Sequence, residues 1–277
     1  MKFGLGIFPT ETSISPVELA VAAEEAGFES FWVPEHTHIP LSEFHFPGGG
    51  APVGEMYKRS LDPFVTLGAC AAATSRISLG TGICLVIERD PIVTAKEVAT
   101  VDVLSGGRFL FGIGGGWNRD EMANHGTDPS TRFALLAERV EVMKTIWRED
   151  EPSFAGRFHS FDPIWCWPKP VQSPHPPILL GGNGSGVLRR VVAYADGWLP
   201  NAFSPTALAP KIAELRSMAS DAGRGPIPVS VFGSKPDAAM VARFEEAGAD
   251  RVTFWVPSEG RDVVLPLVER YAGLLIG

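Results

Sequence analysis

Cysteine is scarce in this chain, and its three copies are too far apart in sequence to form a motif. Cys70, Cys84 and Cys166 make no C-x-x-C pair, and their odd number does not suit a disulfide framework. Each lies among apolar residues, which predicts a buried free thiol in a protein of a reducing compartment. The sequence therefore argues against the small secreted proteins that depend on disulfides.

The chain also lacks any run of lysine or arginine. Its formal net charge is −8 and its isoelectric point is near 5.3. An acidic chain without a basic stripe is a poor partner for nucleic acid or an anionic membrane, so both classes are set aside. The apolar start, residues 1–8, is short and broken by glycine, and no apolar run of about 18 residues follows. We therefore expect a soluble cytoplasmic protein.

Glycine is abundant, with 30 copies, and the densest stretch runs from Leu104 to Asn118 (LSGGRFLFGIGGGWN). Phe109 to Ile113 has the length of a buried strand, with two glycines before it and three after it. Glycines at a strand end allow positive φ and let a flat or phosphorylated ligand approach backbone N–H groups. Alternatively, they only make room for packing. This stretch alone does not decide between the two interpretations.

Strands and helices alternate along the whole chain. The apolar runs predict eight strands, at residues 2–8, 31–33, 77–85, 109–113, 178–180, 197–199, 228–232 and 251–256. An irregular insertion rich in proline and aromatic residues, 150–177, separates the fourth strand from the fifth. The length of 277 residues and the 45% of hydrophobic residues predict one domain, residues 1–277, with the α/β fold of a (β/α)8 TIM barrel. A doubly wound open sheet is the alternative, because alternation does not distinguish a closed sheet from an open one.

An internal repeat supports this count of elements. The tetrapeptide EEAG, followed by FWVP, occurs at residues 24–34 and again at residues 245–257. One unit of helix, glycine and strand is thus used at both ends of the chain. Two local predictions accompany it. Ser15 and Glu18 fit a capping box around Pro16, and residues 39–59, with Phe44, His45, Phe46 and Gly48-Gly49-Gly50, form a long functional loop.

Unusual residues gather at four predicted strand ends, where the active site of such a barrel lies. The second strand ends in Glu35-His36-x-His38, and the next three end in Gly80-Thr-Gly-Ile-Cys84, Gly114-Gly-Gly-Trp-Asn118 and Gly181-Gly-Asn-Gly-Ser185. Backbone donors at such glycine turns suit phosphate, and the polar pair could face the reacting part of a cofactor.

Two other kinds of site are weakly supported by the sequence. In the dinucleotide fingerprint G-x-G-x-x-G, the final glycine is replaced by Trp117 in one cluster and by Val187 in the other. His36 and His38 could begin the ligand set of a barrel metallohydrolase, but the remaining histidines fall in loops or irregular stretches and assemble no metal site.

These residues resemble the luciferase-like monooxygenase superfamily of flavin and deazaflavin enzymes, in particular its oxidoreductases that depend on coenzyme F420. The resemblance runs nearly end to end. It rests on the motifs GFESFWVPEH (27–36), LGTGI (79–83), LSGGR (104–108), GIGGGWN (112–118), PVQ-x-PHPPI (170–178) and ADGW (195–198). It implies a (β/α)8 barrel with an insertion and an enzyme that transfers a hydride between F420 and a small organic substrate.

The resemblance also implies roles for individual residues. It implies a non-proline cis peptide bond at Gly82-Ile83. Gly82, Ile83 and Cys84 would contact the cofactor ring. Gly114, Gly115, Gly116 and Trp117 would line the cofactor, and Gly181, Gly182, Asn183, Gly184 and Ser185 would receive its phosphate. His36 would act as proton donor or acceptor, with Glu35 orienting or tuning it. Alternatively, both only pack the loop base or form a hydrogen bond to the cofactor ring. Trp117, Trp165, Trp167 and Trp255 could shape a substrate pocket or belong to the core, whereas Asp102 and Arg108 look structural.

Two departures from the family patterns bear on the cofactor. Flavin users of the bacterial-luciferase type carry an arginine where this chain has Val93, which argues against their mode of FMN binding. Deazaflavin sugar dehydrogenases carry an acidic residue close to the position of Trp117, so their substrate is not transferred. An FMN-dependent monooxygenase served by a separate reductase is the alternative function, and a barrel that binds a flavin-like molecule without catalysis is a third. The resemblance further implies a homodimer.

Overall fold

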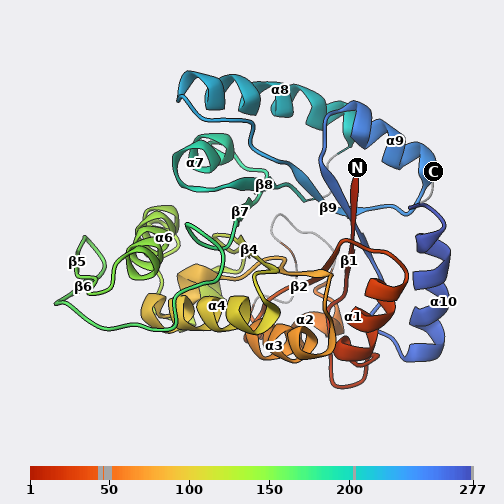
Figure 1. Cartoon of the computed structure of the whole chain (residues 1–277), viewed down its shortest axis with the longest axis horizontal. Coiled ribbons are helices and arrows are strands. Elements are labelled where there is room, and N and C mark those ends of the chain that lie inside the picture. The colour runs from red at the N-terminus through yellow and green to blue at the C-terminus, as the bar shows by residue number, and fades with distance from the viewer. Residues whose placement is uncertain (43–45, 47–51, 202–203, 276–277) are drawn as a thin grey trace.

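The computed structural model describes residues 1–42, 46, 52–201 and 204–275, and its centre is a sheet of eight parallel strands (Figure 1). The strands are β1 (Lys2–Gly6), β2 (Ser30–Val33), β3 (Ser78–Thr81), β4 (Phe109–Ile113), β7 (Ile178–Gly181), β8 (Gly197–Leu199), β9 (Ser230–Ser234) and β10 (Arg251–Trp255). They are ordered β8-β7-β4-β3-β2-β1-β10-β9. Two parallel bridges, Trp198 to Val229 and Asn201 to Phe232, bring β8 and β9 together. The predicted (β/α)8 barrel is confirmed, and the open doubly wound alternative is wrong.

Helices pack around the outside of this barrel and cover its strands. They are α1 (Pro16–Glu25), α3 (Pro63–Ala73), α4 (Pro91–Ser105), α6 (Arg132–Arg148), α7 (Val187–Tyr194), α8 (Pro205–Asp221), α9 (Ala238–Glu246) and α10 (Arg261–Ala272). Proline stands at the start of α1, α3, α4 and α8, where its missing N–H costs no hydrogen bond. The predicted capping box of α1 is wrong, because the Ser15 side chain caps nothing.

The repeat seen in the sequence is also a repeat in space. β1 lies between β2 and β10, the two strands that carry the FWV sequence. Gly27 and Gly248 each end the preceding helical turn with φ near +90°, a conformation that side chains other than glycine rarely adopt. The two units therefore flank the N-terminal strand with the same local geometry.

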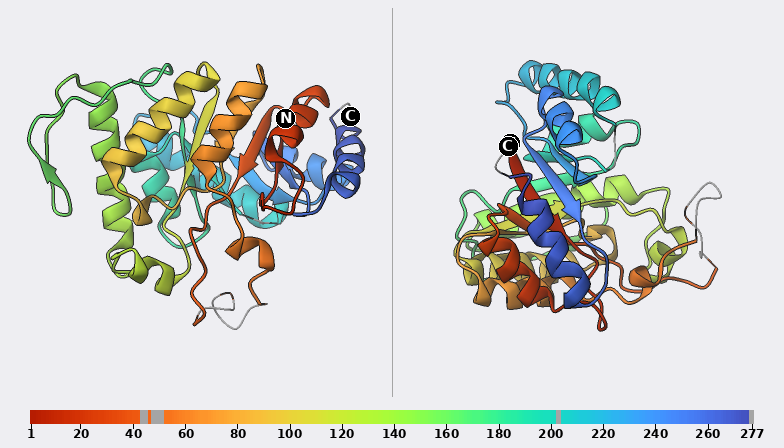
Figure 2. Two further views of the ribbon diagram at one scale, coloured as in Figure 1. Left: turned by 90° about the horizontal axis from the view of Figure 1, so that it is seen from below. Right: turned by 90° about the vertical axis from the view of Figure 1, so that its right-hand side faces the viewer.

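The connections contain structure that the sequence analysis did not predict. Residues 39–59 include the short helix α2 (Glu55–Lys58), and the segment that carries α2 projects from the barrel (Figure 2). Phe44, His45 and Gly48-Gly49-Gly50 of the predicted loop lie outside the described residues. A 3-10 turn, η1 (Val86–Glu88), follows β3, and helix α5 (Arg119–Asn124) follows β4.

The insertion between β4 and β7 is anchored to the barrel by Asp102. After α6 the chain forms a hairpin of β5 (Phe154–Ala155) and β6 (Ser160–Phe161), and then a proline-rich return. The fully buried Asp102 carboxylate accepts hydrogen bonds from Val171 N–H (2.7 Å), Gln172 N–H (2.9 Å) and Gln172 Nε2 (2.7 Å). Arg108 bonds the carbonyls of the α3–β3 connection, so both residues are structural, as predicted.

Two tryptophans of this insertion are displayed to solvent. Trp165 is 81% exposed and Trp167 is 54% exposed, and neither lines the cavity described below. The interpretation that they shape a substrate pocket is therefore wrong for this structure. No helix within the described ranges (1–42, 46, 52–201 and 204–275) is long and apolar enough to cross a membrane.

Replacing Asp102 by alanine should destabilise the fold, because three donors would lose a fully buried acceptor. The expected loss is about 3 kcal/mol of unfolding free energy, in the range for charged hydrogen bonds and unsatisfied buried donors. Urea denaturation measures it. Asp162→Ala, an exposed carboxylate in the same insertion, is the control and should be nearly neutral. Equal stability of the two variants would contradict the anchoring role.

Candidate functional site

A cavity of about 770 Å³ opens at the carboxyl ends of the barrel strands. Its walls come from the eight strands or from the segments that follow them, from Phe8 after β1 to Trp255 at the end of β10. The ends of parallel strands meet at one edge of a barrel, so residues far apart in sequence converge there. Of the predicted site residues, Glu35, His36, Trp117 and the residues of the three glycine clusters, except Cys84, line this cavity.

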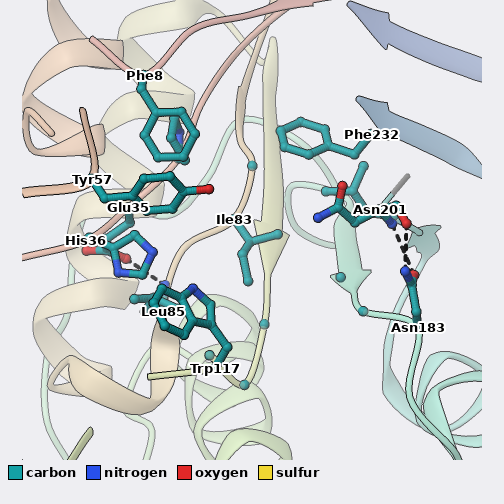
Figure 3. Close-up of a pocket in the computed structure, with 18 of the residues that line it drawn as sticks. Phe8, Glu35, His36, Tyr57, Ile83, Leu85, Trp117, Asn183, Asn201 and Phe232 are labelled. Atoms are coloured by element: carbon teal, nitrogen blue, oxygen red, sulfur yellow. Dashed lines mark hydrogen bonds between the residues drawn. The ribbon is translucent and has the colours of Figure 1, made fainter. Parts of the chain in front are cut away.

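Ile83 forms the floor of the cavity between two groups of side chains (Figure 3). The Gly82-Ile83 peptide is cis, as the resemblance implied. The Ile83 side chain lies over the backbone of the neighbouring strand ends. A Cβ at Gly114 would overlap Ile83 Cδ1, and one at Gly181 would lie 2.9 Å from Ile83 Cγ2. Packing against Ile83 therefore requires glycine at both positions.

His36 is held by a carboxylate that the sequence analysis missed. Nδ1 of His36 lies 2.7 Å from Glu121 Oε2, and Glu121 Oε1 accepts the backbone N–H of Thr37 at 3.2 Å. Glu121 is fully buried in α5, whose N-terminus is capped by the Asn118 side chain. The sequence does carry a signal for this helix: Asn118 and Glu121, directly after the glycine turn, have the Asn-x-x-Glu spacing of a helix start. The contact leaves His36 Nε2 as the ring nitrogen available to a ligand.

Glu35 does not hold His36, and the predicted orienting role is wrong in this structure. Its Oε2 accepts Leu85 N–H at 2.6 Å, and its Oε1 accepts Arg89 Nε at 2.5 Å. Arg89 also bonds Glu97 (2.9 Å) and Asp62 (2.7 Å). Burial lowers the pKa of Arg89, but the negative charge of Glu35, and then of Glu97 and Asp62, holds it above the usual value. Glu35 is thus part of a buried ion-pair network under the cavity wall.

Glu88 adds an uncompensated carboxyl group to this buried region. It is 9% exposed, and its Oε2 has no hydrogen-bond partner among the described residues. Burial first, and then the carboxylates of Glu121 and Glu35, raise its pKa to about 9. Glu88 is therefore neutral at physiological pH, which limits the negative charge behind His36.

Cys84 is a predicted cofactor contact that the structure places elsewhere. It is fully buried and does not line the cavity, although its neighbours Ile83 and Leu85 do. Burial, and then the negative charge of Glu35, raise the pKa of its thiol well above the usual value, so the group is an unreactive core thiol.

The opposite end of the cavity is polar and cationic. The Asn183 side chain bonds the backbone of Asn201 in both directions, at 2.6 and 3.1 Å, which fixes the predicted phosphate loop. Two arginines lie over the ring of Phe133. The guanidinium carbons of Arg190 and Arg132 are 4.0 and 4.4 Å from the centroid of that ring. Both arginines line the cavity, and the sequence analysis missed both. A phosphate at this end would meet two cations near the start of α7.

Metal-binding chemistry finds no support in the geometry. Within the part of the chain that the structure describes, no group of three or more His, Cys, Asp or Glu residues is placed to hold a metal ion. His38 instead bonds Thr37 Oγ1 at 2.9 Å and Asn124 at 3.0 Å, as a loop residue would.

Comparison with known proteins defines the class. Residues 11–259 match the luciferase-like monooxygenase family, and the chain belongs to this family. An uncharacterized protein of Mycobacterium tuberculosis is 40% identical over 99% of both chains. The F420-dependent glucose-6-phosphate dehydrogenase of Kineococcus radiotolerans is 32% identical over 66% of this chain and 50% of its own length.

Solved structures agree on the fold. Monooxygenase RslO1 of Streptomyces bottropensis superposes with a TM-score of 0.81 at 22% identity, over 99% of this chain and 97% of its own. An F420-dependent secondary alcohol dehydrogenase, in complex with an F420-acetone adduct, superposes with a TM-score of 0.79 at 21% identity. The match covers 99% of this chain and 98% of the dehydrogenase chain. The oxygenating constituent of 3,6-diketocamphane monooxygenase from Pseudomonas putida, in complex with FMN, superposes with a TM-score of 0.69 at 18% identity. The match covers 84% of this chain and 67% of the monooxygenase chain. F420-dependent and FMN-binding proteins thus share this barrel.

The raised pKa of Glu88 predicts a pH-dependent stability. A carboxyl whose pKa is about 9 when folded and near 4.5 when unfolded stabilises the fold at low pH, and this contribution is lost as pH rises between those values. As the pH rises from 5.5 to 8, the wild type should therefore lose stability relative to Glu88→Gln. The difference between their unfolding free energies should fall by up to about 1.4 kcal/mol per pH unit. Urea denaturation at both pH values measures this difference, and a difference independent of pH would show that Glu88 is ionised.

Proposed function

We propose that the protein is an oxidoreductase that transfers a hydride between coenzyme F420 and a small organic substrate. The observation that carries this proposal is His36, held by Glu121 in the wall of a cavity whose floor is Ile83. The F420-dependent relatives and structural neighbours support the same assignment.

The lining residues fit a flat cofactor with an anionic tail. The backbone at Gly114 and Gly181, with Ile83 across it, offers a smooth floor that would hold the ring. The loop of Asn183 to Ser185 and the Arg190 guanidinium would hold the phosphate end. A bound deazaflavin supplies or takes up the hydride, and does not readily activate oxygen.

The protein's part in the reaction is proton transfer and positioning. Glu121 accepts a hydrogen bond from Nδ1–H of His36, which leaves Nε2 directed into the cavity. Nε2 can then give a proton to a substrate oxygen, or take one from a hydroxyl, as the hydride moves at the adjacent carbon. Glu121 acts through His36 and is a positioning residue.

The alternative is an FMN-dependent monooxygenase that receives reduced flavin from a separate reductase. Val93 was the residue that argued against FMN, but it lies on α4, is 54% exposed and does not line the cavity. The choice of cofactor therefore depends on the cationic end of the cavity. F420 extends further than FMN beyond its phosphate and carries more negative charge, which favours a site with Arg132 and Arg190.

Equilibrium binding separates the two cofactors. We expect purified protein to bind F420 at least about 10-fold more tightly than FMN, because of the added charge. Arg190→Gln should weaken F420 binding by about 10-fold and reduce its salt dependence, whereas Arg243→Gln, on the exposed surface of α9, should change neither. Fluorescence quenching measures the affinity of the wild type for F420 and for FMN, and the affinity of each variant for F420. Tighter binding of FMN would favour the monooxygenase, which is then tested for oxygen uptake with a flavin reductase.

His36→Ala should lower the rate of hydride transfer by about 100-fold or more, the range of general acid–base catalysis, with little change in F420 affinity. Glu121→Gln should lower kcat and shift the pH profile of kcat through His36, with an unchanged KM. Asp120→Asn, on the same helix, is the matched control. Unchanged turnover in His36→Ala would support the third reading, a barrel that binds its ligand without catalysis. A large loss of cofactor affinity would instead assign His36 to positioning.

We also propose a homodimer. Val65 on α3 is 76% exposed and Val93 on the adjacent α4 is 54% exposed, so large apolar side chains face outward on two helices that pack side by side. Sedimentation velocity at micromolar concentration should give twice the monomer mass. Val65→Glu should shift the protein toward monomer, whereas Val263→Glu, a half-exposed valine on α10, should not. A wild-type monomer would contradict the proposal.

A further inference from the structure

One half of the cavity is built from aromatic rings. Phe8, Tyr57, Trp117 and Trp255 line it, and we call this half the aromatic chamber. Phe8 contacts Tyr57 and Trp255 with ring centroids 4.5 and 5.3 Å apart. Phe46 covers Tyr57 and Trp117 at 5.4 and 5.0 Å. Rings packed against one another in this way form a fixed apolar surface.

Polar groups in the chamber are few: the Tyr57 hydroxyl, the His36 ring and the indole N–H groups of Trp117 and Trp255. Among the described residues, the Tyr57 hydroxyl makes no hydrogen bond, and it points into the cavity on the side of Ile83 (Figure 3). The ring of His36 lies 5.3 Å from that of Tyr57 and 5.6 Å from that of Trp117. Its Nδ1 is bound to Glu121, and no described residue bonds its Nε2. Burial raises the pKa of Tyr57, so its hydroxyl keeps its proton.

Charge is distributed unequally in the cavity. Both oxygens of Glu35 are bound to Leu85 and Arg89, so this carboxylate is neutralised from behind. The cavity-lining guanidinium groups, of Arg132 and Arg190, are stacked on Phe133 and lie outside the aromatic chamber. A negative charge on the part of a substrate remote from His36 would therefore be desolvated in the chamber with neither arginine to pair with it, which is costly.

We propose that the aromatic chamber is the substrate site and that it takes an uncharged, largely apolar alcohol or carbonyl compound. The substrate oxygen accepts a hydrogen bond from the Tyr57 hydroxyl and exchanges its proton with His36 Nε2, while the rings enclose its apolar body. In the direction of reduction, the carbonyl carbon receives a hydride from the reduced deazaflavin, which is thereby oxidised. The C=O bond becomes a single bond, and the oxygen takes the proton of the His36 imidazolium. The inference rests on the proposed function.

Two matched ketones test the charge preference. Acetophenone and 4-acetylbenzoate share the reacting carbonyl and differ by one carboxylate remote from it. With protein and reduced F420, we expect kcat/KM for acetophenone to be at least about 30-fold higher, because an unpaired desolvated charge is strongly disfavoured. Reoxidation of F420, followed by its absorbance, measures both. Equal rates, or a preference for the anion, would overturn the inference.

Removal of one hydroxyl tests the role of Tyr57. Tyr57→Phe should lower kcat/KM for acetophenone by about 10- to 100-fold, the loss of one hydrogen bond in a buried site, with unchanged F420 affinity and thermal stability. Tyr271→Phe, a buried tyrosine of α10 that packs against Phe254 away from the cavity, should match the wild type. Full activity of Tyr57→Phe would overturn the role of its hydroxyl.

The two proposals fail in different ways. If F420 does not bind, the proposed function itself is wrong. If F420 binds but acetone, cyclohexanone, acetophenone and benzophenone are all left unreduced, and the corresponding alcohols unoxidised, the substrate class is wrong and the cofactor assignment stands.

Discussion

The position of one aliphatic side chain, Ile83, determines how the rest of the site is arranged. Ile83 lies across the ends of two neighbouring strands, and it fits only because Gly114 and Gly181 have no side chain to meet it. A third glycine, Gly82, makes room for the ring of Phe232 on the other side. The floor of the cavity is thus apolar and smooth, and every polar group that reaches the cavity must come from its walls.

This floor separates two halves of opposite character. On one side the walls are aromatic and include His36 and Tyr57, which can bond a substrate oxygen; on the other side lie the amides of Asn183 and Asn201 (Figure 3). The guanidinium groups of Arg132 and Arg190 also line that second side. Behind His36, the single guanidinium of Arg89 pairs with three carboxylates, those of Glu35, Asp62 and Glu97, so this region stays net negative, and Glu88, which is neutral, adds nothing to that charge. In these acidic surroundings Glu121 holds Nδ1 of His36, which leaves Nε2 facing the cavity.

The fold was predictable from the sequence because barrel elements are encoded locally. Strand-length apolar runs, prolines at helix starts and repeated glycine stops indicated the eight units, and all eight strands were found close to the predicted positions. The glycine turns and His36 were also recognisable, since strand ends converge in any barrel of this kind.

The partners of these residues were not predictable, because they depend on packing between distant segments. Glu121 lies 85 residues from His36 on a short helix after β4, and Tyr57 comes from a projecting connection. A contact between Glu35 and His36 was predicted because they are neighbours in sequence. Adjacent residues of an extended chain, however, point in opposite directions. The same rule separates Cys84, which faces the core, from Ile83 and Leu85, which face the cavity. Trp165 and Trp167 have the composition of a pocket wall but follow a hairpin that leads away from the barrel.

The most direct test of the account is a crystal structure of the protein with F420 bound. The deazaflavin ring is expected to lie against Ile83, with His36 Nε2 facing the reacting carbon across the aromatic chamber. The phosphate is predicted to bind between Ser185 and Arg190. A ring bound away from Ile83, or a phosphate at the aromatic end, would contradict the division of the cavity on which both proposals depend.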